Sequence, residues 1–275
     1  MKDQAPHAFE NKKGAEDENV EQASKLAPRM IYEVIRRDGE EELERPTSAL
    51  FWSGVAAGLM ISLSVLGEAI LRTYLPDTGS RYLIENLGYS LGFLVVILGR
   101  MQLFTENTIT TVLPFMARPG LGMLGCVMRL WSIVLGANVL GAFAVGALFA
   151  LTSAIPDDLR PAIEDLSRHA TGFAPAEAFM RAIPAGVLVA SIVWMLPQAE
   201  SSSFWVIVAF TWLIAAGDFT HIIAGSVEAA YLIWQGLLGI PDALLQFFLP
   251  VLAGNIIGGT VVFALLAYGQ VREEI

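Results

Sequence analysis

The segment AAGDFTHIIAG, residues 215–225, places Asp218, Thr220 and His221 inside an otherwise apolar stretch. His221 is the most reactive of the three, because an unperturbed imidazole has a pKa of about 6.5 and exchanges a proton near neutral pH. In a narrow apolar pore such a group could donate to, or exchange a proton with, a passing weak-acid anion. The alternative is a neutral histidine bonded to a backbone carbonyl group. An ionisable residue at membrane depth is a functional candidate by default.

A second polar group interrupts an earlier hydrophobic region, where Arg100, Gln102, Thr105 and Glu106 follow one another closely. Arg100 and Glu106 adjoin this interruption, so both are candidates for a direct part in permeation. Charged side chains inside apolar segments face a protein interior or a water-filled cavity rather than lipid.

Glu228 follows His221 after seven positions and falls on a similar face of a helix. We expect its carboxylate to pair with an arginine and to neutralise the bundle interior; the candidates are Arg100, Arg129 and Arg181. Glu68, in an earlier apolar stretch, is expected near the outer interface of the membrane.

The composition indicates which kind of element holds these residues. Of the 275 residues, 55% are hydrophobic and 16% are charged, whereas a water-soluble domain carries about 25% charged residues. Four stretches without charge approach or exceed the roughly 18–20 residues that cross a bilayer as a helix: residues 46–67, 130–156, 182–199 and 243–271. Alternating segments of about ten residues, typical of membrane barrels, are absent from the sequence. The sequence therefore predicts an all-α membrane protein.

Six transmembrane spans are predicted, at about residues 49–75, 82–117, 121–151, 175–196, 204–238 and 243–270. They form one membrane domain, residues 49–270, between a cytoplasmic tail, residues 1–48, and a cytoplasmic C-terminus, residues 271–275. The tail is expected to be disordered over about residues 1–22 and then to form a short amphipathic helix on the membrane surface or the bundle. Residues 153–173 are predicted as a polar loop. The distribution of arginines favours cytoplasmic termini.

Two of these spans are interrupted. In the second, residues 86–99 are too short to cross a bilayer, and residues 107–117 form a separate piece. In the fifth, residues 201–217 and 229–241 flank the group around His221. Interrupted spans at matching places in two halves of a sequence are the best sequence indicator of a transport site. The backbone groups that a break exposes need protein or water partners, and the half-helix N-termini favour an anion.

The two halves, about residues 49–151 and 175–270, resemble each other. LGANVLGAFAVGAL in the third span matches LAGNIIGGTVVFAL in the sixth, which places Asn138 opposite Asn255. AAGLMISLSV in the first span matches PAGVLVASIV in the fourth. Because each half has an odd number of spans, the halves are expected to have opposite orientations in the membrane.

The interruptions also align, with LFTEN matched to DFTHI. This alignment pairs Phe104 with Phe219, Thr105 with Thr220, and Glu106 with His221. Asn138 and Asn255 lie in runs of small residues that permit close helix packing. Pore-lining and scaffold roles are both open for these amides, and the scaffold role is at least as favourable for Asn138.

Three motifs occur in matching order along the chain: LFTENT in the second span, GDFTHIIAG in the fifth and PVLAGNIIGG in the sixth. From about residue 53 to residue 271 the sequence is similar to the formate/nitrite transporter family. The resemblance implies an aquaporin-like protomer of six helices, assembled as a homopentamer with a pore in each protomer. It also implies passage of small monovalent anions such as formate, nitrite or hydrosulfide, with pH-dependent gating or proton coupling.

The resemblance assigns positions in that pore. The central histidine falls on His221, the loop threonine of the first break falls on Thr105, and the cytoplasmic-side constriction falls on Leu103 and Phe104. The aromatic residue of the central constriction, the position facing it and the sixth-span asparagine fall on Tyr89, Ile214 and Asn255. The residues beside the breaks are further candidates for substrate contact: Phe219, Thr220, Asp218, Glu106 and Arg100.

The sequence departs from the family pattern around the central histidine. Thr220 stands where members have an acidic residue, and Gly225 stands where they have an asparagine. Ala170 or a neighbour replaces the lysine that attracts anions, and Gln102 replaces another acidic residue. Asp218 is an extra charge that could stabilise a central imidazolium. We therefore expect a divergent member with its own selectivity.

The leading hypothesis is a channel or transporter for a small monovalent anion or its conjugate weak acid, in a bacterial inner membrane, with pH sensitivity through His221. The alternatives are a channel for neutral small solutes and a pore-dead membrane scaffold whose tail binds a partner. The expected partners are the substrate, the lipid bilayer and further copies of the chain, not nucleic acid. The sequence contains no HExxH motif or glycine-rich phosphate loop, so we expect no enzyme, cofactor or metal site.

Overall fold

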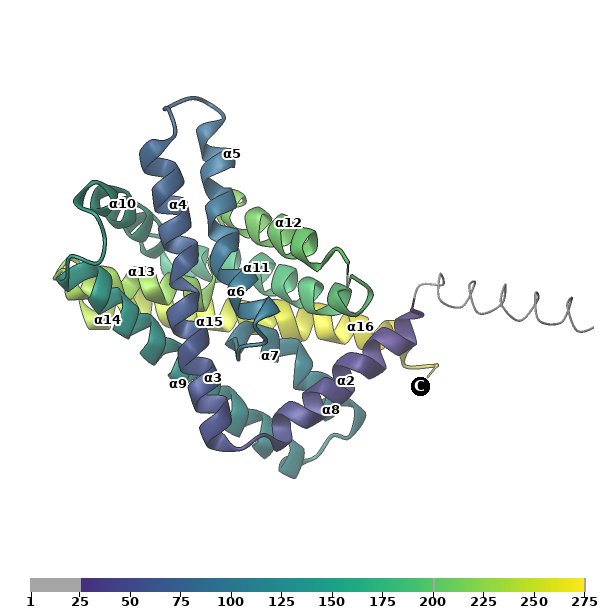
Figure 1. Ribbon diagram of the computed structural model, residues 1–275. Coiled ribbons are helices and arrows are strands. Elements are labelled where there is room, and N and C mark those ends of the chain that lie inside the picture. Colours follow the sequence, from purple (N-terminus) through teal and green to yellow (C-terminus); the bar gives the residue numbers. More distant parts are fainter. Residues whose placement is uncertain (1–25, 200, 275) are drawn as a thin grey trace, which may run out of the picture.

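The computed structural model describes residues 26–199 and 201–274, and these residues form helices and connecting segments without a β-strand (Figure 1). The segment predicted to be disordered, residues 1–22, lies outside the described residues. The all-α fold class is confirmed for the part of the chain that is described.

The first helix, α2 (Pro28–Glu44), packs on the helical bundle. Its apolar residues Ile31, Tyr32 and Ile35 are at most 3% exposed, and the Tyr32 hydroxyl donates to the carbonyl oxygen of Leu113 at 3.4 Å. Of the two positions predicted for the amphipathic segment, the contact with the bundle is therefore the observed one.

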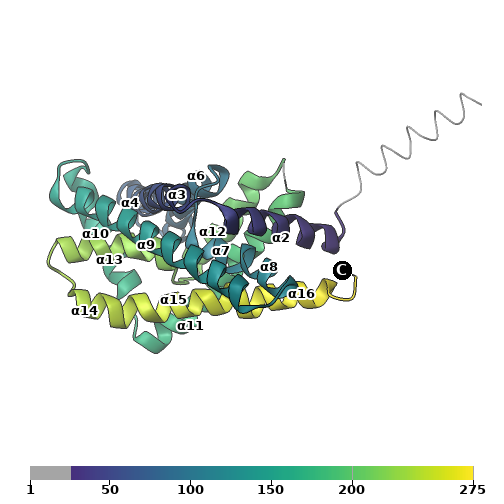
Figure 2. The same ribbon diagram turned by 90° about the horizontal axis from the view of Figure 1, so that it is seen from below.

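The last helix, α16 (Leu265–Val271), ends beside the first turns of α2 (Figure 2). Arg29 Nη1 donates to the carbonyl oxygen of Glu274 at 3.1 Å. The two ends of the described chain therefore lie on the same side of the bundle.

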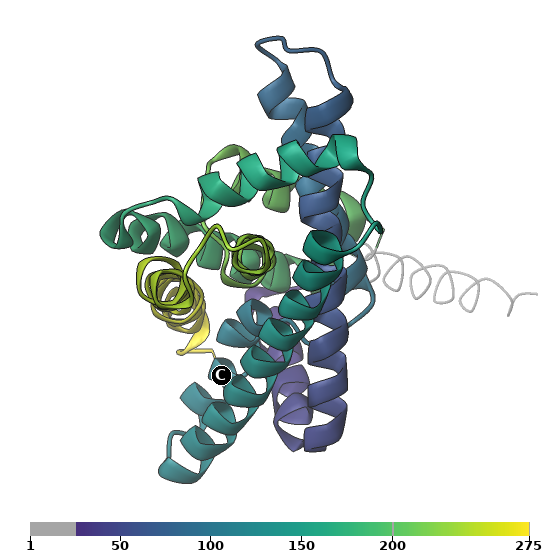
Figure 3. The same cartoon turned by 90° about the vertical axis from the view of Figure 1, so that its left-hand side faces the viewer.

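The first half of the membrane domain runs through α9. Its elements are α3 (Thr47–Met60), α4 (Ser62–Tyr74), α5 (Arg81–Glu85), η1 (Asn86–Tyr89), α6 (Ser90–Leu98), α7 (Phe104–Thr110), α8 (Val112–Ala117) and α9 (Leu121–Leu151). α3 and α4 continue as one rod, and α9 lies against α3 (Figures 1 and 3).

The second half begins after a connecting segment. Its elements are η2 (Asp157–Leu159), α10 (Arg160–Thr171), α11 (Pro175–Met195), η3 (Leu196–Gln198), α12 (Ser203–Ala216), α13 (Ile222–Trp234), α14 (Ile240–Asp242), η4 (Ala243–Phe248), α15 (Leu249–Ile256), η5 (Ile257–Ala264) and α16. η4 and η5 are π-helical, so the final span is one helical run with two π-helical segments between α-helical ones.

Among the described residues, five helical runs are long and apolar enough to cross a membrane: Thr47–Tyr74, Arg81–Leu98, Leu121–Leu151, Pro175–Gln198 and Ile240–Val271. Ser203–Ala216 and Ile222–Trp234 are shorter apolar helices on either side of the second break. The second run starts at Arg81 and is 18 residues long, so the prediction that the piece before the first break is too short to cross was wrong. It begins earlier because residues 81–85 are helical despite their charges.

The segment predicted as a polar loop contains a helix, α10. Ala162, Ile163 and Leu166 are buried on one face of it, while its charged residues face outward, and it packs on α13 and α4. The sequence pattern did not predict this helix, because the segment is highly charged and only a few apolar residues form its buried face.

The predicted repeat is visible in helix packing. A Cβ atom on Gly58 would lie 2.1 Å from the carbonyl oxygen of Asn138, and one on Gly186 would lie 2.3 Å from that of Asn255. Each glycine thus lets two helix backbones approach closely, α3 with α9 and α11 with α15. These contacts confirm the predicted pairing of Asn138 with Asn255 and of the first span with the fourth.

Both breaks have the same backbone course. A glycine ends the preceding helix, and the next residue has a positive φ angle, 50° for Arg100 and 56° for Asp218. The chain is extended again at Leu103 and His221, which are the N-caps of α7 and α13. Leu103 and His221 therefore occupy equivalent positions.

The predicted register of the two breaks was wrong by three residues, because the structure pairs His221 with Leu103 rather than with Glu106. The Phe-Thr dipeptide common to both motifs lies inside a helix in the first break and before the helix in the second. The backbone, not the shared dipeptide, defines equivalence. The incorrect pairs were Phe104 with Phe219, Thr105 with Thr220, and Glu106 with His221.

Candidate functional site

His221 joins the two breaks at the centre of the bundle. Its Nε2 lies 2.9 Å from the Thr105 hydroxyl oxygen, and its Nδ1 accepts a hydrogen bond from the backbone N–H of Ala224 at 3.3 Å. The ring meets Phe93 edge-on, with 5.0 Å between ring centroids. His221 is 2% exposed and Thr105 is 0% exposed.

These contacts define the hydrogen on the imidazole. A backbone N–H can only donate, so Nδ1 of His221 must be the unprotonated nitrogen. In the neutral ring the hydrogen is then on Nε2, which donates to Thr105, and the threonine hydroxyl hydrogen is left for another acceptor. A proton added to Nδ1 would oppose the Ala224 N–H and break the cap of α13.

Two buried asparagines hold the breaks in place. Asn255 Oδ1 accepts from the N–H of Ile222 at 2.9 Å, and its Nδ2 donates to the carbonyl oxygens of Ala182 at 2.8 Å and Thr220 at 3.1 Å. Asn138 makes the same three kinds of bond, with the N–H of Phe104 and the carbonyl oxygens of Gly54 and Gln102. Both asparagines are 0% exposed, which favours the scaffold role over the pore-lining role.

Two cavities approach the His221–Thr105 contact. The larger, about 520 Å³, lies beside α2; its polar lining includes Asp38, Glu42, Arg100, Gln102 and Glu106. The smaller, about 70 Å³, lies beside α10; its lining includes Glu68, Tyr89, His169, Asp218, Phe219, Thr220, His221 and Glu228. Leu103 lines the first cavity and is 1% exposed, so Leu103 and His221 face opposite cavities from equivalent positions.

The predicted pore residues fall into three groups. Arg100, Leu103 and Glu106 line the larger cavity. The smaller cavity receives Tyr89, Asp218, Phe219, Thr220 and His221. The remaining four are buried and line neither cavity: Phe104, Thr105, Ile214 and Asn255. The Phe104 ring packs on Trp131, with ring centroids 5.6 Å apart.

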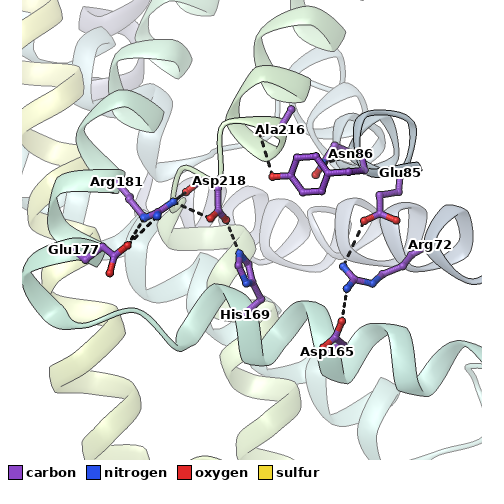
Figure 4. Close-up of polar contacts among 10 residues, drawn as sticks. Arg72, Glu85, Asn86, Asp165, His169, Glu177, Arg181, Ala216 and Asp218 are labelled. Carbon is purple, nitrogen blue, oxygen red and sulfur yellow. Dashed lines mark hydrogen bonds and ion pairs between the residues drawn. The ribbon is translucent and has the colours of Figure 1, made fainter. Parts of the chain in front are cut away.

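Asp218 lies in an ion cluster at the mouth of the smaller cavity (Figure 4). One carboxylate oxygen is 2.8 Å from Nη1 of Arg181 and the other is 2.7 Å from Nε2 of His169. Arg181 also pairs with Glu177 and covers the Phe173 ring at 4.4 Å. The predicted contact of Asp218 with the central imidazole is therefore wrong: the positive φ turns its side chain toward α10 and α11.

Glu228 makes no hydrogen bond or ion pair among residues 26–199 and 201–274. The predicted arginine partners are engaged elsewhere or distant. Arg129 donates to the carbonyl oxygens of Leu43 and Arg45, and Arg181 holds Asp218. The prediction of a structural ion pair for Glu228 was therefore wrong. The spacing from His221 correctly placed both residues on one side of α13.

Sequence reasoning missed the contribution of α2 to the larger cavity. Asp38 and Glu42 line it, and Glu42 Oε2 accepts from Nε2 of Gln102 at 2.7 Å, directly beside the first break. Burial raises the pKa of Asp38, against the opposing effect of the Arg100 charge. An available signal was the amphipathic pattern of this helix, which indicates a buried face but not what the face covers.

Gly225 replaces the expected asparagine for a steric reason. A Cβ atom at this position would lie 2.3 Å from the Phe247 ring, and both residues line the smaller cavity. The aromatic ring thus occupies the space that a polar side chain after the histidine would need.

The family model described as "Formate/nitrite transporter" matches residues 29–269. The "Inner membrane protein YfdC" of Escherichia coli (strain K12) is 45% identical over 244 residues, covering 89% of this chain and 79% of the relative. The "Formate channel FocA" of Haemophilus influenzae (strain ATCC 51907 / DSM 11121 / KW20 / Rd) is 26% identical, covering 77% of this chain and 82% of that protein.

Two solved structures share the fold. A "Pentameric formate channel with formate bound" has a TM-score of 0.69 at 20% identity, covering 82% of this chain and 98% of its own. An "FNT family ion channel" has a TM-score of 0.74 at 17% identity, covering 87% of this chain and 98% of its own. With the family match and the relative in Escherichia coli, these findings show that the chain belongs to the formate/nitrite transporter family.

Proposed function

We propose that this protein passes a small monovalent anion or its conjugate weak acid through the His221–Thr105 contact. The observation that carries the proposal is this hydrogen bond of 2.9 Å, which closes the space between two cavities where two helix breaks meet. Formate, nitrite and hydrosulfide are the substrates to test first, because the relatives include a formate channel and formate is bound in a structural neighbour.

The proposed setting is a bacterial inner membrane, with both termini in the cytoplasm and five copies in a ring. The relative in Escherichia coli is an inner membrane protein, and the structural neighbour is pentameric. In this arrangement residues 49–270 form the channel, residues 1–48 its cytoplasmic tail and residues 271–275 its C-terminus. α2 would cover the cytoplasmic mouth of each pore.

His221 is proposed to make this path pH-sensitive. A second proton on the ring would remove the acceptor of the Ala224 N–H, whose bond length is 3.3 Å. The cap of α13 and the contact with Thr105 would then rearrange together. His221 acts in this proposal as part of the barrier, and its protonation changes how readily the barrier opens.

Flux into proteoliposomes tests the proposal. Wild-type protein and His221→Ala would be compared for formate, nitrite and hydrosulfide between about pH 5 and pH 8, with empty vesicles as the background. We expect wild-type flux of at least one of these substrates and a flatter pH profile in the variant. Identical flux and pH dependence in the two proteins would remove His221 from the mechanism.

The two alternatives give different results in the same vesicles. A neutral-solute channel would accelerate osmotic swelling in uncharged solutes and pass no weak acid. A pore-dead scaffold would pass none of these solutes, and deletion of residues 1–48 alone would abolish its effect in cells. Either result would contradict the proposed substrate class.

A further inference from the structure

The smaller cavity contains polar side chains whose hydrogen-bonding capacity is unused. Glu228 and Tyr89 are each 8% exposed, and both line this cavity of about 70 Å³. Neither the Glu228 carboxyl group nor the Tyr89 hydroxyl has a hydrogen-bond partner within the described part of the chain. Both groups therefore keep hydrogen-bonding capacity for a guest in the cavity that they line.

The size of the cavity limits this guest to a few non-hydrogen atoms, since one water molecule occupies about 30 Å³ in the liquid. Tyr89 stacks on Phe93 with ring centroids 5.2 Å apart, and Phe93 contacts the His221 ring. The guest would therefore lie directly against the His221 barrier, between an aromatic wall and the Glu228 carboxyl group.

The charges around the cavity are mostly negative. The titratable side chains that line it with Glu228 are Glu68 from α4, Tyr89 from η1, His169 from α10, and Asp218 and His221 from the break; α12 and η4 contribute only Ala215 and Phe247. Asp218 is paired with Arg181 and bonded to His169, so neither side chain is left to pair with Glu228 or Glu68. A carboxylate buried without a partner is very costly unless a proton or a cation accompanies it.

A proton fits this site better than a metal ion. Within residues 26–199 and 201–274, no group of three or more His, Cys, Asp or Glu side chains could hold a metal ion. His221 cannot readily supply the proton, because its Nδ1 accepts from Ala224 and its Nε2 hydrogen is donated to Thr105. Like Glu68, Glu228 faces the cavity with no hydrogen bond or ion pair within the described residues, and Glu228 lies on α13, the helix that His221 caps.

We propose that Glu228 is the proton donor and acceptor of the smaller cavity, and that Glu228, Glu68 and Tyr89 together bind a small weak acid in its neutral form. This inference rests on the proposed function. An entering anion takes the proton from Glu228, which forms the O–H bond of the acid and leaves a carboxylate. A hydronium ion from the bulk water at the mouth of the cavity then returns a proton to Glu228 and leaves as water. An anion beside the resulting Glu228 carboxylate would be repelled, so the neutral acid is the species at the barrier.

The experiment follows formate and protons together. Wild-type protein in vesicles with an internal pH dye is expected to take up formate with acidification of the interior, above the rate in empty vesicles. Glu228→Gln keeps the size of the side chain but cannot exchange a proton, so formate uptake should fall on the order of tenfold to a hundredfold and lose its pH dependence. Glu228→Asp keeps the carboxyl group and should restore part of both.

Asp165→Asn is the matched control, because Asp165 is a carboxylate on the same side of the bundle that pairs with Arg72 outside the cavity. It should leave uptake and acidification unchanged. The elution volume of each variant in detergent reports whether it folds as the wild type does. If Glu228→Gln does not fold, the test uses Glu228→Asp and Glu68→Gln instead. Both should show a smaller loss of formate uptake than is expected for Glu228→Gln.

The possible results separate the two proposals. Unchanged uptake and acidification in Glu228→Gln overturns the role of Glu228 and leaves the proposed function standing. If the wild type passes potassium or ammonium ions and Glu228→Gln does not, the cavity is a cation site, and this result overturns the proton-transfer role of Glu228. A wild type that moves no weak acid at any pH overturns the proposed function itself.

Discussion

The two helix breaks have the same backbone and different chemistry. Each begins after a helix-ending glycine, turns at a residue with positive φ, and is held by an asparagine that bonds the first N–H of the following helix and a carbonyl of the break. At the capping position, however, the first break presents Leu103 and the second presents His221. The residues with positive φ also differ, since Arg100 is exposed and Asp218 is ion-paired.

This difference separates the residues that hold the backbone of the breaks from the residues at the caps, whose side chains differ in chemistry. The asparagines and the close-packed glycines satisfy backbone groups that would be very costly to leave unpaired in a membrane. Because they do this alike in both halves, the side chain at the cap is free to differ. The polar contact across the pore therefore comes from His221 in one copy, with Thr105 of the other copy as its partner.

Replacing either buried asparagine should have the largest effect on stability. Asn138→Leu and Asn255→Leu each remove three hydrogen bonds, and the N–H and the carbonyl group of the break lose their asparagine partner. At about 1–3 kcal/mol for each unsatisfied group, we expect both variants to lose most folded protein in detergent, as measured by thermal unfolding. A variant that unfolds like the wild type at either position would contradict the equivalence of the two breaks.

Adding a methyl group at the close helix contacts should cost less. Gly58→Ala and Gly186→Ala place a Cβ atom about 2.1 Å and 2.3 Å from a backbone oxygen, and overpacking of this kind costs about 1–3 kcal/mol. The midpoint of thermal unfolding should fall by similar amounts in the two variants. Gly136→Ala is the control, since nothing lies within 4 Å of a Cβ atom there; an equal fall in the control would mean that loss of glycine itself is responsible.

Making the two caps alike should change transport more than stability. In His221→Leu the Thr105 contact is lost, and the apolar side chain still fills the barrier. We therefore expect substrate flux at neutral pH to fall about tenfold, which corresponds to a barrier higher by roughly 1.4 kcal/mol. The flux should also no longer depend on pH. Leu103→Ala should change the rate and keep the profile. If the profiles of the two variants change equally, the chemical difference between the breaks has no role in pH sensitivity.

Neutralising the residue with positive φ should have the smallest effect. Asp218→Asn removes the ion pairs with Arg181 and His169, whose side chains are 32% and 60% exposed, so the loss of stability should be about 0.2–1 kcal/mol. Arg100→Gln has no ion pair to lose and should stay within about 0.5 kcal/mol of the wild type. Thermal unfolding in low and high salt checks both, and a loss in Asp218→Asn that salt does not reduce would argue against an ion-pair origin.

The sequence by itself determined the membrane class, both interruptions and the pairing of Asn138 with Asn255. Long apolar runs identify spans whatever surrounds them, because a helix in lipid satisfies its own backbone. The place of His221 in the second break followed from the same pattern. The helix α10 escaped prediction, because its buried face appears only once α13 and α4 lie against it.

Only the tertiary structure decided which polar groups meet. It set the register of the breaks through hydrogen bonds between residues far apart in the chain, turned Asp218 toward Arg181, and brought Glu42 of α2 to Gln102. It also left Glu228 facing a cavity with no hydrogen-bond or ion-pair partner in the part of the chain that the structure describes. Partners of this kind lie tens to hundreds of residues apart in the sequence, and local spacing carries no information about the distances between helices.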